Sequence, residues 1–247
     1  MHIAVIGGTG LIGSRLVRDL DAAGHRAVAH SHSTGVDVIT GEGMDAALSG
    51  ADVVVDVTNS PTFDDASPDF FRTSMDNLVA AARKADVQHF VVLSIVGVDQ
   101  VPELDCYRAK TLQEDLLKAG PVPHSIVRAT QFMEFIDTVL SWTADGTTVR
   151  LPRTRLQPVA AADVAATVAE IATGTPLHGT VDLAGPDAYP LDELGRITLR
   201  AKGDERSVTT DETAGMFAAV KGDALAPKDD AARIGTIRYA DWLAENA

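Results

Sequence analysis

The feature that most constrains this chain is a glycine-rich turn near its start, in which Gly7, Gly10 and Gly13 recur at three-residue spacing. Residues 3–6, just before it, are all apolar, which is typical of a parallel strand buried on both faces. Residues 11–23, just after it, carry an amphipathic helical pattern. The turn therefore predicts the strand-turn-helix unit that opens many parallel α/β sheets.

Each glycine has its own physical role in such a unit. Gly7 allows the tight turn, Gly10 lets the backbone approach a phosphate, and Gly13 lets the helix pack close to the strand. The helix also points its free N–H groups and positive dipole end at a pyrophosphate. The spacing alone fits an ordinary flexible turn as well, but its place between a strand and a helix favours a dinucleotide site. We expect the dinucleotide to contact Gly7, Thr9, Gly10, Leu11, Ile12 and Gly13.

The first half of the chain continues to alternate between strand and helix patterns. Apolar runs predict further strands at residues 26–30, 36–39, 51–57, 89–93 and 124–128. Helical patterns predict helices at residues 44–48, 70–85 and 107–119. Strands and helices that alternate through short connections are typical of a doubly wound parallel sheet, the Rossmann type of α/β fold.

The alternation weakens after residue 147. We expect strands at residues 148–151, 157–159 and 180–184, and helices at residues 161–173 and 192–201, with Asp192 as the cap of the last helix. No linker, repeat or low-complexity tract marks a second domain. We therefore expect residues 1–247 to form a single domain, in which roughly residues 150–247 contribute a small lobe that covers the substrate.

Charge and composition exclude several classes of function. The chain has 21 Lys and Arg against 35 Asp and Glu, a net charge of −14 with no basic run, so we expect no nucleic-acid partner. No apolar run approaches the roughly 20 residues that cross a bilayer, and the seven histidines show no metal-ligand spacing. The single Cys106 excludes an internal disulfide and agrees with a reducing cytoplasm, where we expect a monomer or homodimer acting on a small molecule.

Two polar segments after predicted strands are further candidates for the cofactor. Ser31, His32 and Ser33 follow the second strand and can donate hydrogen bonds to a 2′-phosphate, and no carboxylate appears before Asp37. We therefore favour NADP over NAD, although a polar loop that meets only solvent has the same composition. Thr58 and Asn59 follow a central strand and border the expected crevice, but they are also good turn formers.

Four ordered segments give the chain a resemblance to a known family. They are Gly7-Gly8-Thr9-Gly10-Leu11-Ile12-Gly13, Leu93-Ser94-Ile95-Val96-Gly97, Tyr107-Arg108-Ala109-Lys110 and Val127-Arg128-Ala129-Thr130-Gln131-Phe132. Together they resemble the atypical short-chain dehydrogenase/reductases, specifically the NmrA-like group, most strongly over residues 1–135. The resemblance implies an NAD(P) cofactor and places Ala129, Gln131 and Phe132 against its nicotinamide. It also places His32 where the group commonly has an arginine for the NADP phosphate.

The same resemblance implies a catalytic serine, tyrosine and lysine. Ser94 matches the serine and Lys110 matches the lysine, which also holds the nicotinamide ribose. The position of the tyrosine, four residues before the lysine, is Cys106, whereas Tyr107 lies three residues before it. Both positions share a helix face with Lys110, so Tyr107 remains the candidate proton donor.

The departure at Cys106 leaves three interpretations open. Tyr107 acts as the proton donor in a shifted geometry; the acceptor is a flavin, quinone or activated alkene that needs no phenol; or the protein binds nucleotide without turnover. We expect an NAD(P)H-dependent oxidoreductase that transfers hydride to or from a small carbonyl, quinone or activated alkene. The alternative is a non-catalytic sensor of NADP(H) that reports to a protein partner.

Overall fold

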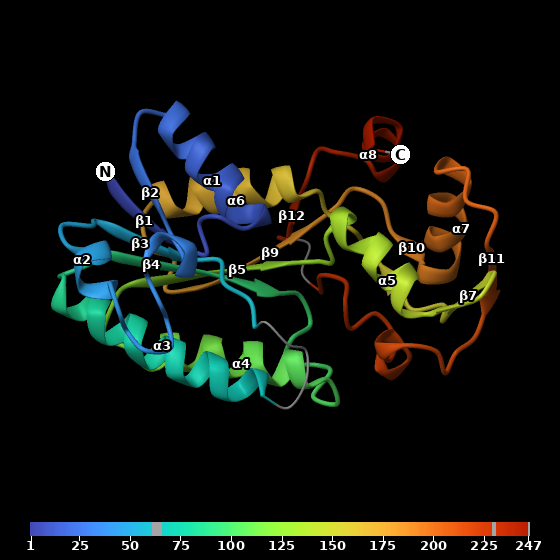
Figure 1. The fold of residues 1–247 in the computed structure, drawn as a ribbon, viewed down its shortest axis with the longest axis horizontal. Coiled ribbons are helices and arrows are strands. Elements are labelled where there is room, and N and C mark those ends of the chain that lie inside the picture. Colours follow the sequence, from blue (N-terminus) through green and yellow to red (C-terminus); the bar gives the residue numbers. More distant parts are fainter. Residues whose placement is uncertain (61–65, 229–230, 247) are drawn as a thin grey trace.

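The computed structural model describes residues 1–60, 66–228 and 231–246. Among these residues, seven strands form a parallel sheet in the order β12-β9-β5-β4-β3-β1-β2 (Figure 1). The strands are β1 (His2–Ile6), β2 (Arg26–His30), β3 (Val53–Asp56), β4 (His89–Ile95), β5 (His124–Ala129), β9 (Gly179–Ala184) and β12 (Arg233–Ile234). This confirms the predicted doubly wound α/β fold.

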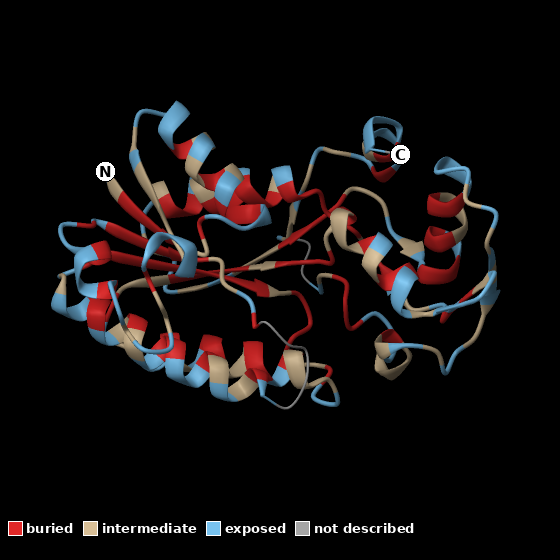
Figure 2. Cartoon of the chain, viewed as in Figure 1, coloured by how far each residue is buried: buried red, intermediate tan, exposed pale blue. Residues whose placement is uncertain are grey.

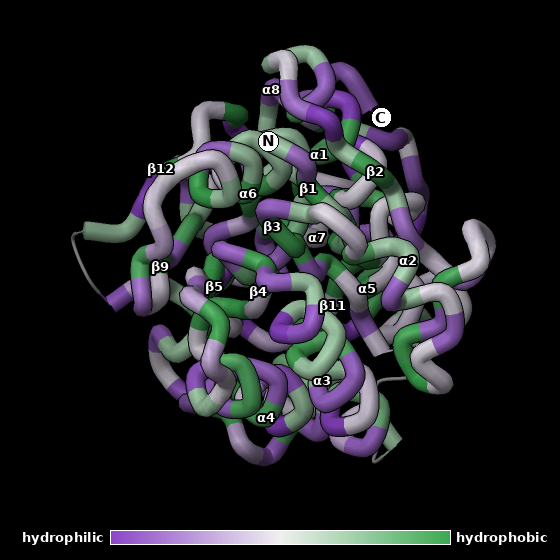
Figure 3. The backbone as a smooth tube through the Cα atoms, turned by 90° about the vertical axis from the view of Figure 1, so that its left-hand side faces the viewer, coloured by the Kyte–Doolittle hydropathy of each residue, from purple (hydrophilic) through white to green (hydrophobic). Residues whose placement is uncertain are grey.

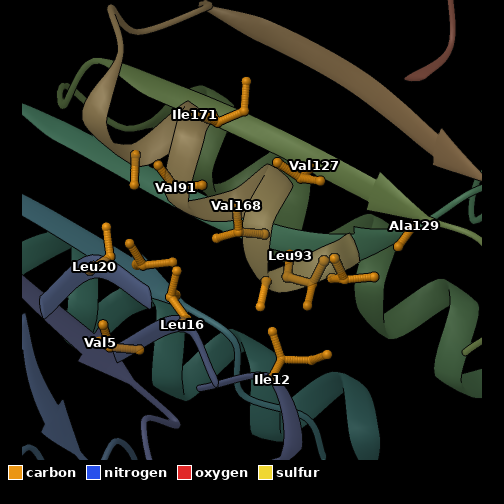
Figure 4. Close-up of a cluster of buried hydrophobic side chains, with 14 of the residues drawn as sticks. Val5, Ile12, Leu16, Leu20, Val91, Leu93, Val127, Ala129, Val168 and Ile171 are labelled. Carbon is orange, nitrogen blue, oxygen red and sulfur yellow. The ribbon is translucent and has the colours of Figure 1, made fainter. Parts of the chain in front are cut away.

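Helices cover both faces of the sheet because its central strands place apolar side chains on both faces. Ile3 and Val5 face one side, where α1 (Leu11–Ala22) and α6 (Ala161–Thr173) pack. Figure 4 shows this cluster, with Leu16 and Leu20 of α1 pointing toward the strands. These two leucines are 0% and 1% exposed, so each stabilises the fold by about 1.5–3 kcal/mol.

The opposite face is covered by three other helices. Ala4 and Ile6 point to this side, against α2 (Met44–Leu48), α3 (Ser67–Lys84) and α4 (Asp105–Ala119). Figure 3 shows the strands between the two helix layers, and Figure 2 shows that each helix buries only its inner side. The site therefore rests on a sheet that is packed from both sides.

A second group of elements follows β5 and lies beyond the carboxyl ends of the central strands (Figure 1). Its core includes Met133, Leu140, Leu151 and Leu194, and it also receives Tyr107 from α4. We call this group the lobe. Its elements are the short 3-10 helices Met133–Phe135 and Met216–Ala219, α5 (Ile136–Trp142), β6 (Ala144–Asp145), β7 (Thr148–Leu151), β8 (Arg155–Leu156), β10 (Tyr189–Pro190), α7 (Leu191–Ala201), β11 (Ser207–Thr210) and α8 (Tyr239–Asn246).

The second half of the chain does not contribute only to this lobe. The α6 helix and the strands β9 and β12 return to the central sheet and its outer layer. The lobe also begins before residue 150, at Met133. Sheet and lobe are thus interleaved along the sequence.

The prediction of a strand at residues 36–39 is wrong, because the structure has no strand there. The carboxylate of Asp37 accepts hydrogen bonds from the N–H groups of Ile39 and Thr40, at 2.7 and 3.2 Å. The side chain of Asn77 donates to the carbonyls of Val38 and Ile39. These side chains take the backbone groups that a neighbouring strand would use, so the segment forms a turn and β2 becomes the edge of the sheet.

Two expectations in the second half are also wrong. Residues 157–159 form no strand, because Val159 makes only an isolated bridge to Phe132 and the nearby strand is β8. Asp192 is not the cap of α7, which begins one residue earlier after Pro190. The Asp192 carboxylate instead accepts hydrogen bonds from the side chains of Arg196 and Thr210.

The described residues also bear on membranes and metals. None of their helices is both long enough and apolar enough to cross a bilayer. Within the same ranges, no cluster of three or more His, Cys, Asp or Glu side chains is arranged to hold a metal ion.

Candidate functional site

The glycine turn joins β1 to α1 as a compact corner. The N–H groups of Gly7 and Gly8 both donate to the carbonyl of His30 in β2, at 2.9 and 3.1 Å. Gly7 has a φ of +80°, a left-handed conformation that disfavours other residues. A Cβ on Gly13 would lie 2.3 Å from the carbonyl oxygen of Gly7, so only glycine lets α1 approach the turn this closely.

The first turn of α1 faces a hollow of about 830 Å³, within the usual range for cofactor sites. Gly10 is the N-cap of this helix, and no side chain caps the free N–H groups there. Thr9, Gly10, Leu11 and Ile12 line the hollow together with Gly7. Gly13 does not line it and serves the packing of α1. An uncapped helix end at a hollow of this size fits the pyrophosphate of a dinucleotide.

The end of the hollow near β2 carries both hydroxyl and charged groups. Ser31 and His32 line it, whereas Ser33 does not and shares a 2.8 Å hydrogen bond with the Ser31 hydroxyl. Asp37 lines the same end. Hydrogen bonds from the N–H groups of Ile39 and Thr40 hold the pKa of Asp37 below its usual range. This end of the hollow therefore presents the Asp37 carboxylate in addition to the predicted Ser31 hydroxyl and His32 imidazole.

A ring of buried and partly buried hydrogen bonds lies at the carboxyl end of β3. The Asp56 carboxylate accepts from the N–H of Thr58 at 2.9 Å and from the Gln113 amide at 2.8 Å. The Lys110 ammonium donates to Gln113 Oε1 at 2.9 Å and to the Thr58 carbonyl at 3.1 Å, which closes the ring. The ring fixes the chain before Thr58 and Asn59, which both line the large hollow.

Lys110 is a buried cation with every donor in use. Its third hydrogen bond goes to the carbonyl of Leu93, at 3.1 Å, and its nitrogen lies 4.6 Å from the centre of the Phe71 ring. Burial lowers the pKa of Lys110 to about 8, although the charges of Asp56 and Glu114 oppose this shift. The side chain therefore holds the floor of the hollow in place and loses its charge in mildly alkaline solution.

Ser94 points into a buried ion pair. Its hydroxyl donates to Glu114 Oε1 at 2.6 Å, and the Arg128 guanidinium binds both oxygens of the same carboxylate, at 2.8 and 2.7 Å. Burial would raise the pKa of Glu114, but the hydrogen bonds from Arg128 and Ser94 lower it. Arg128 also contacts Asp99. The predicted catalytic serine is thus held by the protein itself, at the wall of both hollows.

A second hollow of about 150 Å³ adjoins the large one. Ala129, Gln131 and Phe132 line it, as do Cys106 and Tyr107 of α4. The two hollows share Asn59, Ser94, Ile95, Lys110 and Phe132.

Tyr107 is not paired with Lys110 in the part of the chain that the structure describes. Its hydroxyl accepts a 3.2 Å hydrogen bond from Gln131 Nε2. Burial raises the pKa of Tyr107, because the phenolate would lose its water, and burial also raises the pKa of the Cys106 thiol. Neither group is therefore tuned as an acid, and the three predicted catalytic side chains form no hydrogen bonds with one another.

Sequence reasoning missed the residues that support the site. Asp56, Gln113 and Glu114 are all fully buried polar side chains beneath the two hollows. The helical spacing does place Gln113 and Glu114 three and four residues after Lys110, on its face. That spacing carries no information about Asp56 or Arg128, because these two residues lie on the strands β3 and β5 rather than on α4.

Comparisons with known proteins agree with this geometry. A family model described as NAD(P)H-binding matches residues 7–175. The chain is 32% identical over 211 residues to a (4-alkanoyl-5-oxo-2,5-dihydrofuran-3-yl)methyl phosphate reductase of Streptomyces griseus, which covers 77% of this chain and 70% of the relative.

Solved structures share the fold at low sequence identity. The triphenylmethane reductase of Citrobacter sp., complexed with NADP(H), has a TM-score of 0.76 at 18% identity and covers 100% of both chains. A short-chain dehydrogenase/reductase superfamily protein of Agrobacterium tumefaciens with bound NAD has a TM-score of 0.68 at 17% identity and covers 85% of both chains. The chain therefore belongs to the NAD(P)H-binding family whose model it matches.

Proposed function

We propose that this protein is a reductase that uses NADPH to reduce a small conjugated acceptor, either a quinone or an activated alkene. The observation that carries the proposal is the junction of the two hollows. The large one has the size and the uncapped helix end that suit a dinucleotide, and the small one opens from it beside Ser94 and Lys110. A small molecule in the second hollow would therefore lie next to the reactive end of the cofactor.

The state of Tyr107 supports a conjugated acceptor over a simple carbonyl. Reduction of a simple ketone needs an acid beside the carbonyl oxygen, and a phenol serves when a nearby lysine lowers its pKa. Here the pKa of Tyr107 is raised and the Lys110 ammonium is bonded elsewhere. A quinone or activated alkene delocalises the added electron pair and takes its proton from water afterwards.

The bound cofactor would supply the hydride. The residues of this chain would do the rest: the first turn of α1 would hold the pyrophosphate, and Ser31 and His32 would meet the adenosine ribose or its phosphate. Lys110 and Asp56 keep the floor of the hollow rigid, and Phe132 lines both hollows where they meet. We propose NADPH as the preferred cofactor, because His32 and the Ser31 hydroxyl are donors for a 2′-phosphate.

The relative from Streptomyces griseus gives the proposal a chemical starting point. Its name describes reduction of an unsaturated lactone that carries an acyl group, which is an activated alkene. We propose acceptors of this electronic type for the present chain.

The test is oxidation of NADPH by the purified protein with three matched panels: quinones, unsaturated lactones or enones, and simple ketones. We expect turnover with one of the first two panels and none above background with simple ketones. Failure with every panel, or a preference for simple ketones, contradicts the proposal.

A non-catalytic sensor, of the kind found in the NmrA-like group, is the second candidate. The missing Tyr107–Lys110 contact is the observation in its favour. A sensor must bind one redox form better than the other, so equal calorimetric affinities for NADP+ and NADPH would contradict it.

A further inference from the structure

The small hollow includes a buried hydrogen-bonding group that the protein leaves unused. Gln131 donates through Nε2 to the Tyr107 hydroxyl, but its buried Oε1 has no hydrogen-bond partner among the described residues. Three other polar side chains that line it are occupied: the Ser94 hydroxyl by Glu114, the Thr130 hydroxyl by the Gln157 carbonyl, and the Lys110 ammonium by its three acceptors. A buried acceptor without a partner costs free energy, which a bound hydroxyl or N–H group would recover.

The Tyr107 hydroxyl completes this position. It accepts from Gln131, so its own hydrogen remains available to a ligand. A ligand hydroxyl placed between the two side chains can donate to Gln131 Oε1 and accept from Tyr107. The pair therefore recognises a neutral alcohol through one donated and one accepted hydrogen bond.

The same hollow is unsuited to an anion. Among its described lining residues Lys110 is the only Lys or Arg, and its donors are already used. A third hollow of about 340 Å³ adjoins at Cys106 and Met216, and its described lining includes Glu103 and Asp105 but no Lys or Arg. The sequence of residues 61–65 and 229–230, which the structure does not describe, contains no Lys or Arg either.

Phosphate groups in proteins are bound by Arg, Lys or free backbone N–H groups, and an unpaired charge in an apolar cavity is costly. The remaining walls of the small hollow are largely aromatic or aliphatic, with Phe132, Phe135, Met216 and Phe217. A phosphate monoester in this place would lose its water and gain no cation.

We propose that the acceptor reduced by this protein is uncharged and carries a hydroxyl group bound by Gln131 and Tyr107, and that the phosphorylated form of the same acceptor is excluded. The inference rests on the proposed reductase function. It separates this chain from its Streptomyces griseus relative, whose named compound is a phosphate.

The reaction balances without a further reactant. Hydride from the reduced cofactor adds to the β-carbon of the activated double bond, and a proton from water adds to the α-carbon. The acceptor gains two electrons and the cofactor loses two, while the hydroxyl group is unchanged. The hydroxyl therefore serves recognition only.

The first test compares two ligands on the unchanged protein. One is a saturated acyl-lactone with a free hydroxymethyl group, and the other is its phosphate ester; both are unreactive and report binding alone. Calorimetry in the presence of saturating NADP+ should show at least tenfold tighter binding of the alcohol. Equal binding, or tighter binding of the phosphate, overturns the inference.

The second test assigns the recognition to Gln131. In Gln131→Leu we expect at least a fivefold loss of affinity for the alcohol and little change for the matching compound with a methyl group in place of the hydroxymethyl group. Gln88→Leu, which removes an exposed amide far from the hollow, is the control. Equal losses for both compounds contradict the assignment.

Measuring turnover distinguishes failure of this inference from failure of the proposed reductase function. With the unsaturated pair, reduction of the alcohol alone supports both. Reduction of the phosphate with equal kcat/KM overturns the inference and leaves the reductase intact. Tight binding of the alcohol with no reduction contradicts the reductase proposal and leaves the binding preference standing.

Discussion

The large hollow and the small hollow are built in different ways. The large one depends on backbone: the turn at Gly7, the close approach at Gly13 and the free N–H groups of α1. The small one depends on side chains from separate elements, with Tyr107 on α4, Gln131 after β5 and Met216 in the lobe. A backbone site that binds the cofactor phosphates is compatible with many different substrates. The side chains of the small hollow, by contrast, determine which acceptor can bind. The comparison teaches that binding of the cofactor and choice of the acceptor can be disrupted separately.

The largest expected effect comes from Gly13→Ala. The new Cβ would meet the Gly7 carbonyl at 2.3 Å, so the turn or α1 must move. We expect dinucleotide affinity to fall at least 100-fold, or about 2.7 kcal/mol, as measured by calorimetry. The control is Gly179→Ala, whose Cβ meets only an ordinary contact at 3.6 Å. An unchanged affinity in Gly13→Ala would contradict the backbone account of the large hollow.

The next largest effect is on stability and concerns the Glu114–Arg128 ion pair, which holds the Ser94 hydroxyl at the junction of the two hollows. In Glu114→Gln the partly buried Arg128 loses a charged partner that it binds through two hydrogen bonds. We expect the free energy of unfolding to fall by about 2 kcal/mol, measured by urea denaturation. Asp115→Asn, at an exposed neighbouring carboxylate, should change it by less than about 0.5 kcal/mol. Equal effects would show that the pair has no structural role.

A third prediction concerns pH and the junction itself. Lys110 has a pKa of about 8, so its charge is present below pH 8 and is lost above it. If the Lys110 charge orders the floor beside the cofactor, kcat/KM should fall about fivefold between pH 8 and pH 9, in step with the charged fraction of Lys110. Lys110→Met should lower turnover and abolish this pH dependence, whereas the exposed Lys84→Met should keep it. A profile that stays flat to pH 9 in the unchanged protein contradicts the prediction.

The smallest effect sharpens the account of the large hollow. His32→Arg places a permanent cation where the hollow already has the Ser31 hydroxyl and the Asp37 carboxylate. We expect the ratio of NADP to NAD affinities to rise about threefold to tenfold. His25→Arg, at a position that lines none of the hollows described above, should leave the ratio unchanged. No rise in His32→Arg would mean that the 2′-phosphate lies elsewhere.

Much of the fold could be predicted because hydrophobic periodicity is a local property. The predicted bounds of β2, α2, β7 and α6 agree with the structure at every residue. The strand expected at residues 36–39 fails because a side chain, Asp37, takes the backbone N–H groups first. Apolar pattern does not register such competition between side chain and backbone.

The site residues also fall into a group that could be predicted from local sequence and a group that could not. The residues of the glycine turn are consecutive, so their sequence already places them at one hollow. The ring of Asp56, Gln113 and Lys110 joins a strand to a helix more than fifty residues away. The orphaned Gln131 oxygen likewise depends on packing around it. No spacing in the sequence encodes these contacts, because they exist only once the sheet has formed.

The most direct test of the account follows one hydrogen from the cofactor to the acceptor. NADPH that carries deuterium at both hydrogen positions of its reactive carbon is mixed with the protein and an uncharged, hydroxyl-bearing unsaturated lactone, and the mass of the product is measured by mass spectrometry. The junction of the two hollows predicts a product that has gained one deuterium, directly from the cofactor. A reduced product without deuterium, or deuterated NADPH that stays bound and unoxidised, would contradict hydride transfer between these hollows.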